Sequence, residues 1–382
     1  MCRPGEQLRT VPPLRKRRRT FIIGNFISHR RLSLRLARTY TRAMRPYVLV
    51  FALVLLSACS RRDPIELSGP TMGTTYSVKI VDPPQGMTAA GAREIVDEVL
   101  ALIDVQMSTY RADSEISSFN RSDSTDWFAV SPELQEVIAG SLRVSEETQG
   151  AIDITIAPLV NLWGMGPTGE PKDLPTPAEL DAARARVGYR NLSTRENPPA
   201  VRRAIAGITL DLNAVAPGYA VDLLAAGFRA HAATNFMIDI GGEVRVEGLN
   251  AEGKPWRIAI ERPLDAEPEP YAIASLTNMA ITTSGEYRHY YMRDGHRYSH
   301  TIDPRSARPV EHALASVVVI APSAFEADAW ATALNVLGEA EGYALAQRRH
   351  IPAMFIVDRS GKLEPVMTQE FAPYLVVKPS EE

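Results

Sequence analysis

Two oxygen-bearing side chains stand four residues apart in a segment with helical periodicity. Asp328 and Thr332 lie within residues 324–337, where apolar residues recur at helical spacing. Residues four apart share one face of a helix. A carboxylate and a hydroxyl on one face, with a carbonyl oxygen from elsewhere, form a partial site for Mg²⁺, which prefers oxygen ligands and keeps some of its waters. The same residues also fit a structural role, in which Asp328 caps a helix or pairs with an arginine and Thr332 bonds to its own helix.

Four further segments carry polar residues where a packed fold does not require them. They are residues 72–76 (MGTTY), 150–155 (GAIDIT), 211–219 (DLNAVAPGY) and 284–288 (SGEYR). Metalloprotease, nucleophile-elbow, P-loop and dinucleotide-fold motifs do not occur in the sequence. Gly241-Gly242 follows an alternating apolar segment and is typical of a tight hairpin turn, although two glycines also permit close ligand approach. The residues alone therefore do not identify a reaction.

Charge divides the chain sharply at Cys59. The 382 residues contain 42 Lys and Arg against 45 Asp and Glu, a formal net charge of -3. Residues 1–58 hold 13 of the basic residues and a single acid, which leaves the rest of the chain with a net charge of -15. This acidic body gives no electrostatic basis for binding nucleic acid, which depends on Lys and Arg neutralising phosphates. Two cysteines, of which only Cys59 lies in or beside the body, exclude a disulfide framework.

Residues 47–58 are typical of a signal-peptide core. This uncharged, mostly apolar run of 12 residues is too short to span a bilayer, which needs about 20. It ends in Leu-Ser-Ala-Cys at 56–59, which resembles the bacterial lipobox, whose cysteine receives a diacylglyceryl group. Met44 and Arg45 complete a short signal, so we expect Met44 to be the true start. A buried apolar helix with an incidental cysteine is the alternative interpretation.

These features predict the organisation of the chain. Residues 1–58 are expected to form a signal and N-terminal extension, residues 59–70 a lipidated tether, and residues 71–382 the catalytic body. The protein is then expected to be lipid-anchored at Cys59, on the periplasmic face of a bacterial membrane.

The body is predicted to be an α+β fold. Period-two and continuous apolar patterns predict strands at residues 75–80, 208–212, 236–240, 243–246, 257–260 and 315–320. Helices are predicted at 92–107 and 324–337, with further helix starts at Ser131 and Thr176, where a cap residue precedes Pro and an acid. Asp294-Gly295 and Ser360-Gly361 predict hairpins. Because these elements alternate without a strict βαβ repeat, we expect mixed sheets with packed helices, arranged as two lobes of one compact unit.

Seven ordered motifs resemble the ApbE family of periplasmic flavin transferases, which move FMN from FAD to a protein threonine or serine. They extend from residue 71 to about residue 374 and comprise Met72-Gly73-Thr74, Ser108-Thr109-Tyr110, residues 153–160, residues 211–222, residues 283–288, residues 300–304 and Ala327-Asp328-Ala329. A lipobox before such a body is also usual in the family. The resemblance implies an FAD cleft and a flavin acceptor protein as partner, expected to be a subunit of a membrane redox complex.

The resemblance also implies roles for individual residues. The FAD site would comprise Met72, Tyr110, Ala151, Ile152, Asp153, Asp211, Pro217 and Ile302. Mg²⁺ would be held by the Ala214 carbonyl, Asp328 and Thr332. Pro217 replaces a lysine of many members, so a cationic phosphate contact is absent or comes from elsewhere, with Arg288 as the candidate. Ala331 replaces a carboxylate of some members, which leaves more water ligands on the metal.

His300 is the candidate general base. Attack of a hydroxyl on the FAD pyrophosphate builds charge on phosphate oxygens, which Mg²⁺ neutralises. A threonine hydroxyl is a weak nucleophile and benefits from a base worth roughly 10²–10⁴-fold. Histidine titrates near neutral pH, and His300 stands at the end of a predicted strand beside Ile302 and Asp303. A structural role is the alternative for a lone histidine at such a position.

Two other functions use the same residues. The first is a metal-dependent FAD pyrophosphatase that releases FMN and AMP, with water in place of the threonine hydroxyl. The second is a non-catalytic flavin-binding lipoprotein, favoured if the departures at Pro217 and Ala331 disable the site.

The lipobox predicts the effect of removing its thiol. A chain that starts at Met44 should be lipidated and fractionate with membranes, because bacterial lipoproteins carry the two or more acyl groups that stable anchoring needs. Cys59→Ala should release the body into the soluble periplasmic fraction or leave an unprocessed precursor. Fractionation followed by immunoblotting measures this. Normal processing and membrane association of Cys59→Ala would contradict the lipobox interpretation.

Overall fold

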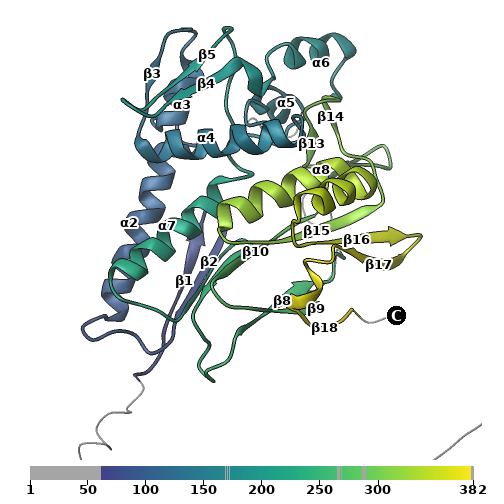
Figure 1. The fold of residues 1–382 in the computed structure, drawn as a ribbon. Coiled ribbons are helices and arrows are strands. Elements are labelled where there is room, and N and C mark those ends of the chain that lie inside the picture. The colour runs from purple at the N-terminus through teal and green to yellow at the C-terminus, as the bar shows by residue number, and fades with distance from the viewer. Residues whose placement is uncertain are drawn as a thin grey trace, which may run out of the picture. The chain divides into compact units, whose positions relative to one another are not determined.

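An antiparallel sheet of eight strands is the base on which the helices pack (Figure 1). The computed structural model describes residues 62–379 except 168, 170, 172, 265, 266, 268 and 286–289. The strand order is β1-β2-β6-β7-β10-β15-β16-β17, and each neighbouring pair is antiparallel. The strands are β1 Ile65–Thr71, β2 Thr74–Ile80, β6 Phe236–Ile240, β7 Glu243–Glu247, β10 Met279–Gly285, β15 Leu314–Ala321, β16 Ala353–Arg359 and β17 Lys362–Met367.

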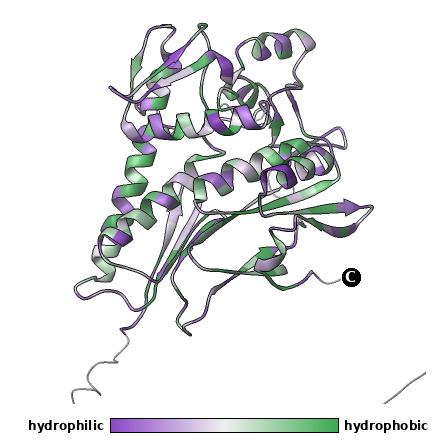
Figure 2. Ribbon diagram, in the orientation of Figure 1, coloured by the Kyte–Doolittle hydropathy of each residue, from purple (hydrophilic) through white to green (hydrophobic). Residues whose placement is uncertain are grey.

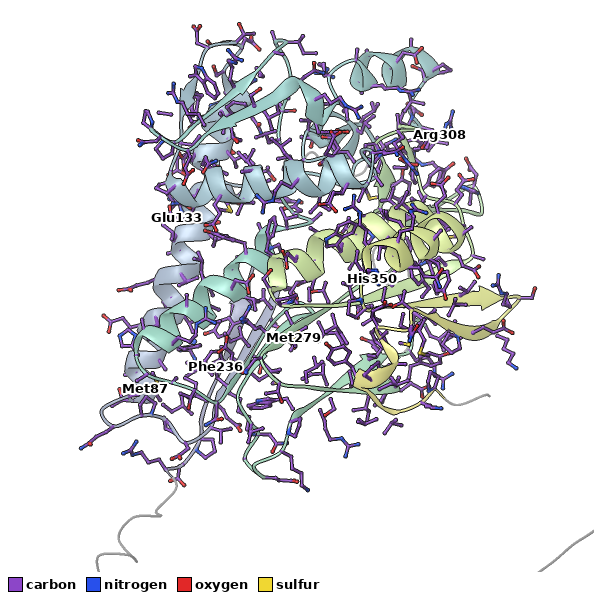
Figure 3. All side chains as sticks on the ribbon, viewed as in Figure 1. Met87, Glu133, Phe236, Met279, Arg308 and His350 are labelled. Atoms are coloured by element: carbon purple, nitrogen blue, oxygen red, sulfur yellow. The ribbon has the colours of Figure 1, made fainter. Side chains whose placement is uncertain are left out.

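One face of this sheet is covered by helices. These are α7 (Ala216–Ala230) and α8 (Ala324–Arg349), with α2 (Ala89–Met107) packed on α7 and on β1. Strand alternation provides the apolar face: Phe236 and Ile238 are buried in the cluster under the helices, whereas Met237 between them packs against the cluster on the opposite face. Side chains fill the space between the two layers (Figure 3).

The opposite face is covered by a smaller sheet of order β18-β9-β8. Its strands are β8 Trp256–Glu261, β9 Pro270–Leu276 and β18 Leu375–Val377, with the 3-10 turn η2 (Ala372–Tyr374) before β18. Trp256 and Tyr271 pack there against Ile281 and Val318 of the large sheet. The central strands are therefore buried on both faces and rich in hydrophobic residues (Figure 2).

The remaining elements form a second lobe above the helices (Figure 1). They are α3 Glu115–Arg121, β3 Phe128–Ala129, α4 Pro132–Glu147, α5 Ala157–Leu162, α6 Pro177–Arg184, η1 Tyr189–Asn191, β4 Leu192–Arg195, β5 Ala200–Arg203, β11 Tyr290–Arg293, β12 His296–Ser299, β13 Ile302–Asp303 and β14 Arg308–Pro309. The α+β class is confirmed, and the described residues from 62 onward group as one compact unit.

Local sequence signals gave most elements correctly. Ser131 caps α4, and Thr176 caps α6 in a capping box with Glu179. Both expected hairpins form, β11-β12 around Asp294-Gly295 and β16-β17 around Ser360-Gly361. The helix predicted at 324–337 forms, but it is only the first part of α8, which continues to Arg349. Gly338, with φ 73°, interrupts the helical geometry directly after the predicted end.

Two local predictions were wrong. Residues 65–70, expected in a tether, belong to β1, because Ile65 and Leu67 bury their side chains and the backbone pairs fully with β2. Residues 208–212 are not a strand, although Ile208, Leu210 and Leu212 are buried as the alternation suggested. Their backbone forms only an isolated parallel bridge, between Thr209 and Ile156, and the amide of Asn120 takes up Leu210: it accepts from Leu210 N at 2.7 Å and donates to Leu210 O at 2.8 Å.

Within residues 62–379 as described, no helix is both long enough and apolar enough to cross a membrane. Cys59, Met44 and the expected signal segment lie outside the described residues.

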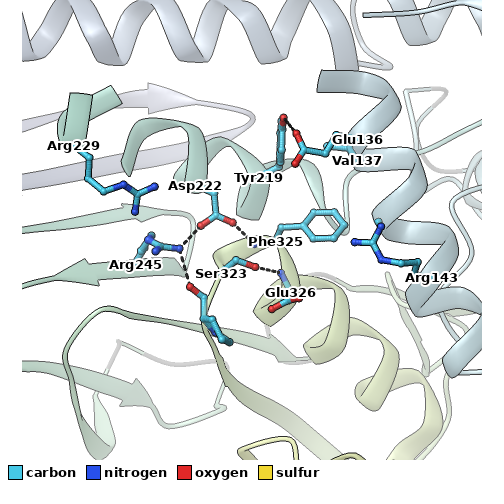
Figure 4. A pocket seen from close by; sticks show the side chains of 12 residues that line it. Glu136, Val137, Arg143, Tyr219, Asp222, Arg229, Arg245, Ser323, Phe325 and Glu326 are labelled. Carbon is cyan, nitrogen blue, oxygen red and sulfur yellow. Dashed lines mark hydrogen bonds and ion pairs between the residues drawn. The ribbon is translucent and has the colours of Figure 1, made fainter. Parts of the chain in front are cut away.

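The N-terminus of α8 is fixed by a carboxylate of α7 (Figure 4). Asp222 accepts the backbone N–H groups of Ala324 and Phe325 at 3.0 and 2.9 Å, and pairs with Arg245 at 2.7 Å. These N–H groups have no partner within their own helix, so the carboxylate satisfies them and interacts favourably with the helix dipole.

This contact predicts a stability effect. Asp222→Ala should lower the free energy of unfolding by about 1–3 kcal/mol, since it leaves two N–H groups without their acceptor and removes one of the two carboxylates that pair with Arg245. Urea denaturation followed by circular dichroism measures the loss. Asp97→Ala, at an exposed position of α2, is the matched control and should change stability by less than about 0.5 kcal/mol. Equal stability of the two variants would show that the contact does not hold α8.

Candidate active site

Helices α7 and α8 cross unusually closely at Gly218. A Cβ atom at this position would lie 2.5 Å from the Ala324 carbonyl oxygen and 2.9 Å from Asp328 Cβ. The Gly218 N–H donates to Asp328 Oδ2 at 3.1 Å. Because α7 has no side-chain hydrogen bond from its own N-cap residue, Asp328 supplies an acceptor to its first turn. The sequence analysis missed Gly218; a glycine directly after Pro217 at a helix start was the available signal.

The three predicted metal ligands each offer an oxygen atom, two from α8 and one from the loop before α7. Asp328 is 5% exposed, and only one of its oxygens accepts a hydrogen bond from the described residues. Thr332 is half-buried one turn further along α8, and its hydroxyl has no hydrogen-bond partner among the described residues. Ala214 lies just before α7, and its carbonyl accepts no hydrogen bond from the described part of the chain. One carboxylate, one hydroxyl and one carbonyl form an all-oxygen set that fits Mg²⁺.

The electrostatics at Asp328 favour a cation. Burial raises the pKa of Asp328 well above its ordinary value, and the nearby Glu243 carboxylate raises it further, while the Gly218 N–H acts in the opposite direction. Among the described residues, no three His, Cys, Asp or Glu side chains gather as a metal site, so any cation here depends on neutral oxygens and water as well.

Two hairpin turns lie beside each other near this crossing. Met72 is 39% exposed at the tip of the β1-β2 turn, where Met72 and Gly73 both have positive φ. Gly241 and Gly242 form the β6-β7 turn, also with positive φ, which confirms the hairpin interpretation of this pair. A Cβ atom on Gly241 would lie 2.9 Å from Thr74 Cγ2, so the two turns are in close contact.

Tyr110 and Asp211 are two further residues with predicted FAD roles. Tyr110 follows α2 and is 65% exposed, so its side chain is accessible to a ligand. Partial burial raises the pKa of Tyr110, and the Asp211 charge adds to this effect. Asp211 is buried, and burial raises the pKa of its carboxyl although Asn213 N donates to Oδ1 at 2.8 Å.

Both carboxylate oxygens of Asp153 accept hydrogen bonds from within the protein. Its Oδ1 accepts from Thr155 N and Thr155 Oγ1, at 2.8 and 2.6 Å, and its Oδ2 accepts from Tyr189 N at 2.7 Å. Burial raises the pKa of this carboxyl, and these bonds lower it. The neighbouring Ala151 and Ile152 are buried, so a ligand contact from this segment would use the little surface that remains.

The segments with predicted FAD roles are connected through the loop before α7. Asp211 N donates to Ile154 O at 2.8 Å, which joins residues 211–217 to the Asp153 segment. The same loop then passes Ala214 and enters α7 at Pro217, which is half-buried and occupies a first-turn position where its missing N–H is not needed. The structure thus links Asp153, Asp211, Ala214 and Asp328 within one continuous region.

His300 and Ile302 lie in the second lobe. His300 is half-buried in the turn between β12 and β13. Ile302 is buried in β13 against Trp163, whose ring stacks on Tyr298 at a centroid distance of 5.8 Å. This aromatic pair fixes the strand that leads to His300. Arg288, the candidate replacement for the missing lysine, lies outside the described residues.

A separate cavity of about 440 Å³ lies between α4, α7 and the start of α8 (Figure 4). It contains Tyr219, bonded to Glu136 at 2.8 Å, together with the Asp222–Arg245 pair. The sequence-predicted site residues are not among those that line it. The side chains that line this cavity include Asp222, which holds the start of α8, and the cavity lies apart from the candidate active site.

Comparison with known proteins supports the family resemblance seen in the sequence. Residues 72–355 match the model of the ApbE family. A relative from Vibrio cholerae, named FAD:protein FMN transferase, is 40% identical over 334 residues, which is 87% of this chain and 99% of the relative. The solved flavin transferase ApbE from Vibrio cholerae superposes with a TM-score of 0.76 at 40% identity, covering 82% of this chain and 99% of that one. The apo flavinyl transferase ApbE of Pseudomonas stutzeri gives a TM-score of 0.75 at 38% identity, covering 82% and 96%.

The fold and the matches over most of the chain define the class of protein. This chain belongs to the ApbE family.

The helix crossing predicts that Gly218 cannot be replaced without cost. Gly218→Ala should destabilise the protein by about 1–3 kcal/mol, because the added methyl meets backbone atoms that cannot rotate away. Gly91→Ala in α2 is the matched control, since its Cβ would meet only the Thr88 hydroxyl at 3.5 Å, and it should be neutral or stabilising by up to about 1 kcal/mol. Urea unfolding of both variants compares them directly. A Gly218→Ala variant as stable as Gly91→Ala would contradict the close approach.

Proposed function

We propose that this protein is a Mg²⁺-dependent FAD:protein FMN transferase, which attaches FMN to a threonine or serine hydroxyl of a target protein and releases AMP. The observation that carries the proposal is the oxygen set at the α7–α8 crossing, within a chain 40% identical to a transferase of this name over 87% of its length. Asp328 has one oxygen held by Gly218 and the other available for a ligand.

The reaction is a phosphoryl transfer. The acceptor hydroxyl attacks the phosphorus on the FMN side of the FAD pyrophosphate, a new P–O bond forms, and the P–O bond to AMP breaks. The hydroxyl proton passes to a base, and AMP leaves with the electrons of the broken bond. When bound at Asp328, Thr332 and the Ala214 carbonyl, Mg²⁺ would supply neutralisation of the pyrophosphate charge.

Residues of the chain would position the reactants. Tyr110 offers an exposed ring for stacking, and Met72 projects from an adjacent turn. Asp211, Asp153, Ala151, Ile152, Pro217 and Ile302 would complete the FAD site. His300 would accept the hydroxyl proton, and its place on a turn fixed by the Trp163–Tyr298 stack supports this role.

The sequence before the body supports a location. A lipobox at Cys59 would anchor the body at the periplasmic face of a bacterial membrane. An acceptor that is a subunit of a membrane redox complex would then lie within reach of a tethered enzyme.

One experiment separates this function from its two alternatives. The protein is incubated with FAD and Mg²⁺, with and without the membrane fraction of its source bacterium, and products are followed by chromatography and by in-gel flavin fluorescence. The transferase gives a fluorescent protein band that survives denaturation, together with AMP. Free FMN and AMP without acceptor would indicate the pyrophosphatase, and unchanged FAD with bound flavin would indicate a binding protein.

A general base at His300 predicts a defect in transfer and not in binding. His300→Ala should retain FAD affinity, while the rate of FMN transfer falls on the order of 10²-fold or more. His231→Ala, exposed at the end of α7, is the control and should transfer at the parental rate. Stopped assays of FMN transfer measure both. A parental rate in His300→Ala would assign this histidine a structural role.

The cation site predicts graded losses on α8. Asp328→Ala should abolish Mg²⁺-dependent transfer at ordinary Mg²⁺ concentrations, since a carbonyl and a hydroxyl alone do not displace its tightly held waters. Thr332→Ala should lose less, because water can replace a neutral ligand. FAD binding, measured by flavin fluorescence, should persist in both.

Asp328 also caps α7, so a second substitution separates the two roles. Asp328→Asn keeps an oxygen for the Gly218 N–H but loses the charge, and should therefore fold normally and remain inactive. An active, EDTA-sensitive Asp328→Asn would place the metal elsewhere.

A further inference from the structure

Glu243 is a half-buried carboxylate on the sheet, on the same face as the helices. It is the first residue of β7, directly after the Gly241-Gly242 turn. Val244 and Val246 pack in the cluster on the far face, so Glu243, Arg245 and Glu247 share the other face by strand alternation. Arg245 confirms the direction, because it pairs with Asp222 of α7 at 2.7 Å.

Glu243 is one of the acids that influence Asp328, and Asp239 of β6 in turn influences Glu243. Burial raises the pKa of Glu243 to about 8, and the Glu243 charge contributes to the raised pKa of Asp328. No Lys, Arg or His of the described residues forms an ion pair with either carboxylate. A carboxylate in such a poorly hydrated place is unfavourable as a charge unless a cation or a hydrogen-bond donor compensates it.

A buried hydroxyl on the neighbouring strand faces the same space. Thr282 is 2% exposed, and its Oγ1 has no hydrogen-bond partner among the described residues. The register Ile281↔Val244 places Thr282 beside Glu243, one step further along the two strands. Ser284 accepts from Asn335 of α8 at 3.2 Å, so this face of β10 points toward α8. A buried polar group without a protein partner indicates a water or ligand in that space.

We propose that Glu243 supplies a second negative charge to the divalent cation held at Asp328, acting on it from the sheet side with the Thr282 hydroxyl beside it. The proposal rests on the cation site of the proposed function. It makes Glu243 a positioning residue, which holds the cation and its waters and does not touch the reacting atoms. An outer carboxylate of this kind typically contributes 10–100-fold to metal affinity.

The test measures cation binding without the reaction. Mn²⁺ binding to the full-length protein in detergent, without FAD or acceptor, is followed by the electron paramagnetic resonance signal of free Mn²⁺. Glu243→Gln keeps the size of the side chain and should weaken Mn²⁺ affinity about 10–100-fold. Glu243→Asp keeps the charge and should recover part of this loss. Glu326→Gln, at an exposed position of α8, is the matched control for a lost charge and should bind Mn²⁺ like the parent.

Thermal unfolding distinguishes this role from a structural one. In metal-free protein, Glu243→Gln removes a poorly hydrated carboxyl and should raise the melting temperature, while the stabilisation gained on adding Mg²⁺ should shrink. A structural carboxylate would instead lower the melting temperature of the metal-free variant.

The outcomes separate the two proposals. Parental Mn²⁺ affinity in Glu243→Gln, with affinity lost in Asp328→Asn, overturns the role of Glu243 and leaves the cation site standing. Parental affinity in Asp328→Asn overturns the cation site itself.

Discussion

The crossing of α7 over α8 is the contact on which the rest of the site depends. Each helix supplies a carboxylate that accepts hydrogen bonds from the first turn of the other helix. Asp328 of α8 accepts one N–H from α7, and Asp222 of α7 accepts two N–H groups from α8. Each helix therefore satisfies N–H groups that the other leaves without a partner, and Gly218 allows the close approach that these hydrogen bonds need. The Ala214 carbonyl, Asp328 and Thr332 keep their relative positions only while this crossing holds.

The carboxylates at this crossing lower the stability of the fold, because they are poorly hydrated there. Asp328 and Glu243 are desolvated carboxylates, and the Thr282 hydroxyl lies buried without a protein partner. Apolar residues of similar volume would make a more stable core at these positions. A fold retains such a cluster when a ligand offsets its cost, which is the physical basis for placing a divalent cation and a pyrophosphate here.

The two lobes carry different parts of the proposed site. The sheet lobe provides the rigid helix crossing and the two glycine-containing turns at Gly73 and Gly241. The second lobe provides His300, Ile302 and the Asp153 segment, in which the carboxylate is used to hold its own loop. The bond from Asp211 N to Ile154 O connects the lobes immediately before α7. In the proposed function, the cation, the flavin and the acceptor hydroxyl would meet where the two lobes join. The Asp222–Arg245 pair holds the start of α8 outside this region.

Local order in the sequence determined most of the helices and strands, whereas distant contacts determined the site. Capping residues, period-two alternation and the Asp294-Gly295 turn predicted α4, α6, β6 and the β11-β12 hairpin, since each signal acts within a few residues. The spacing of Asp328 and Thr332 placed both on α8 for the same reason. Sequence reasoning misassigned residues 65–70 and 208–212, because a partner strand in one case and the Asn120 side chain in the other decide their conformation. It likewise missed Gly218 and Glu243, whose importance comes only from atoms far away in the chain: Ala324 and Asp328 against Gly218, and Asp328 opposite Glu243. Such contacts arise when helices pack on a sheet, so only the tertiary structure decides them.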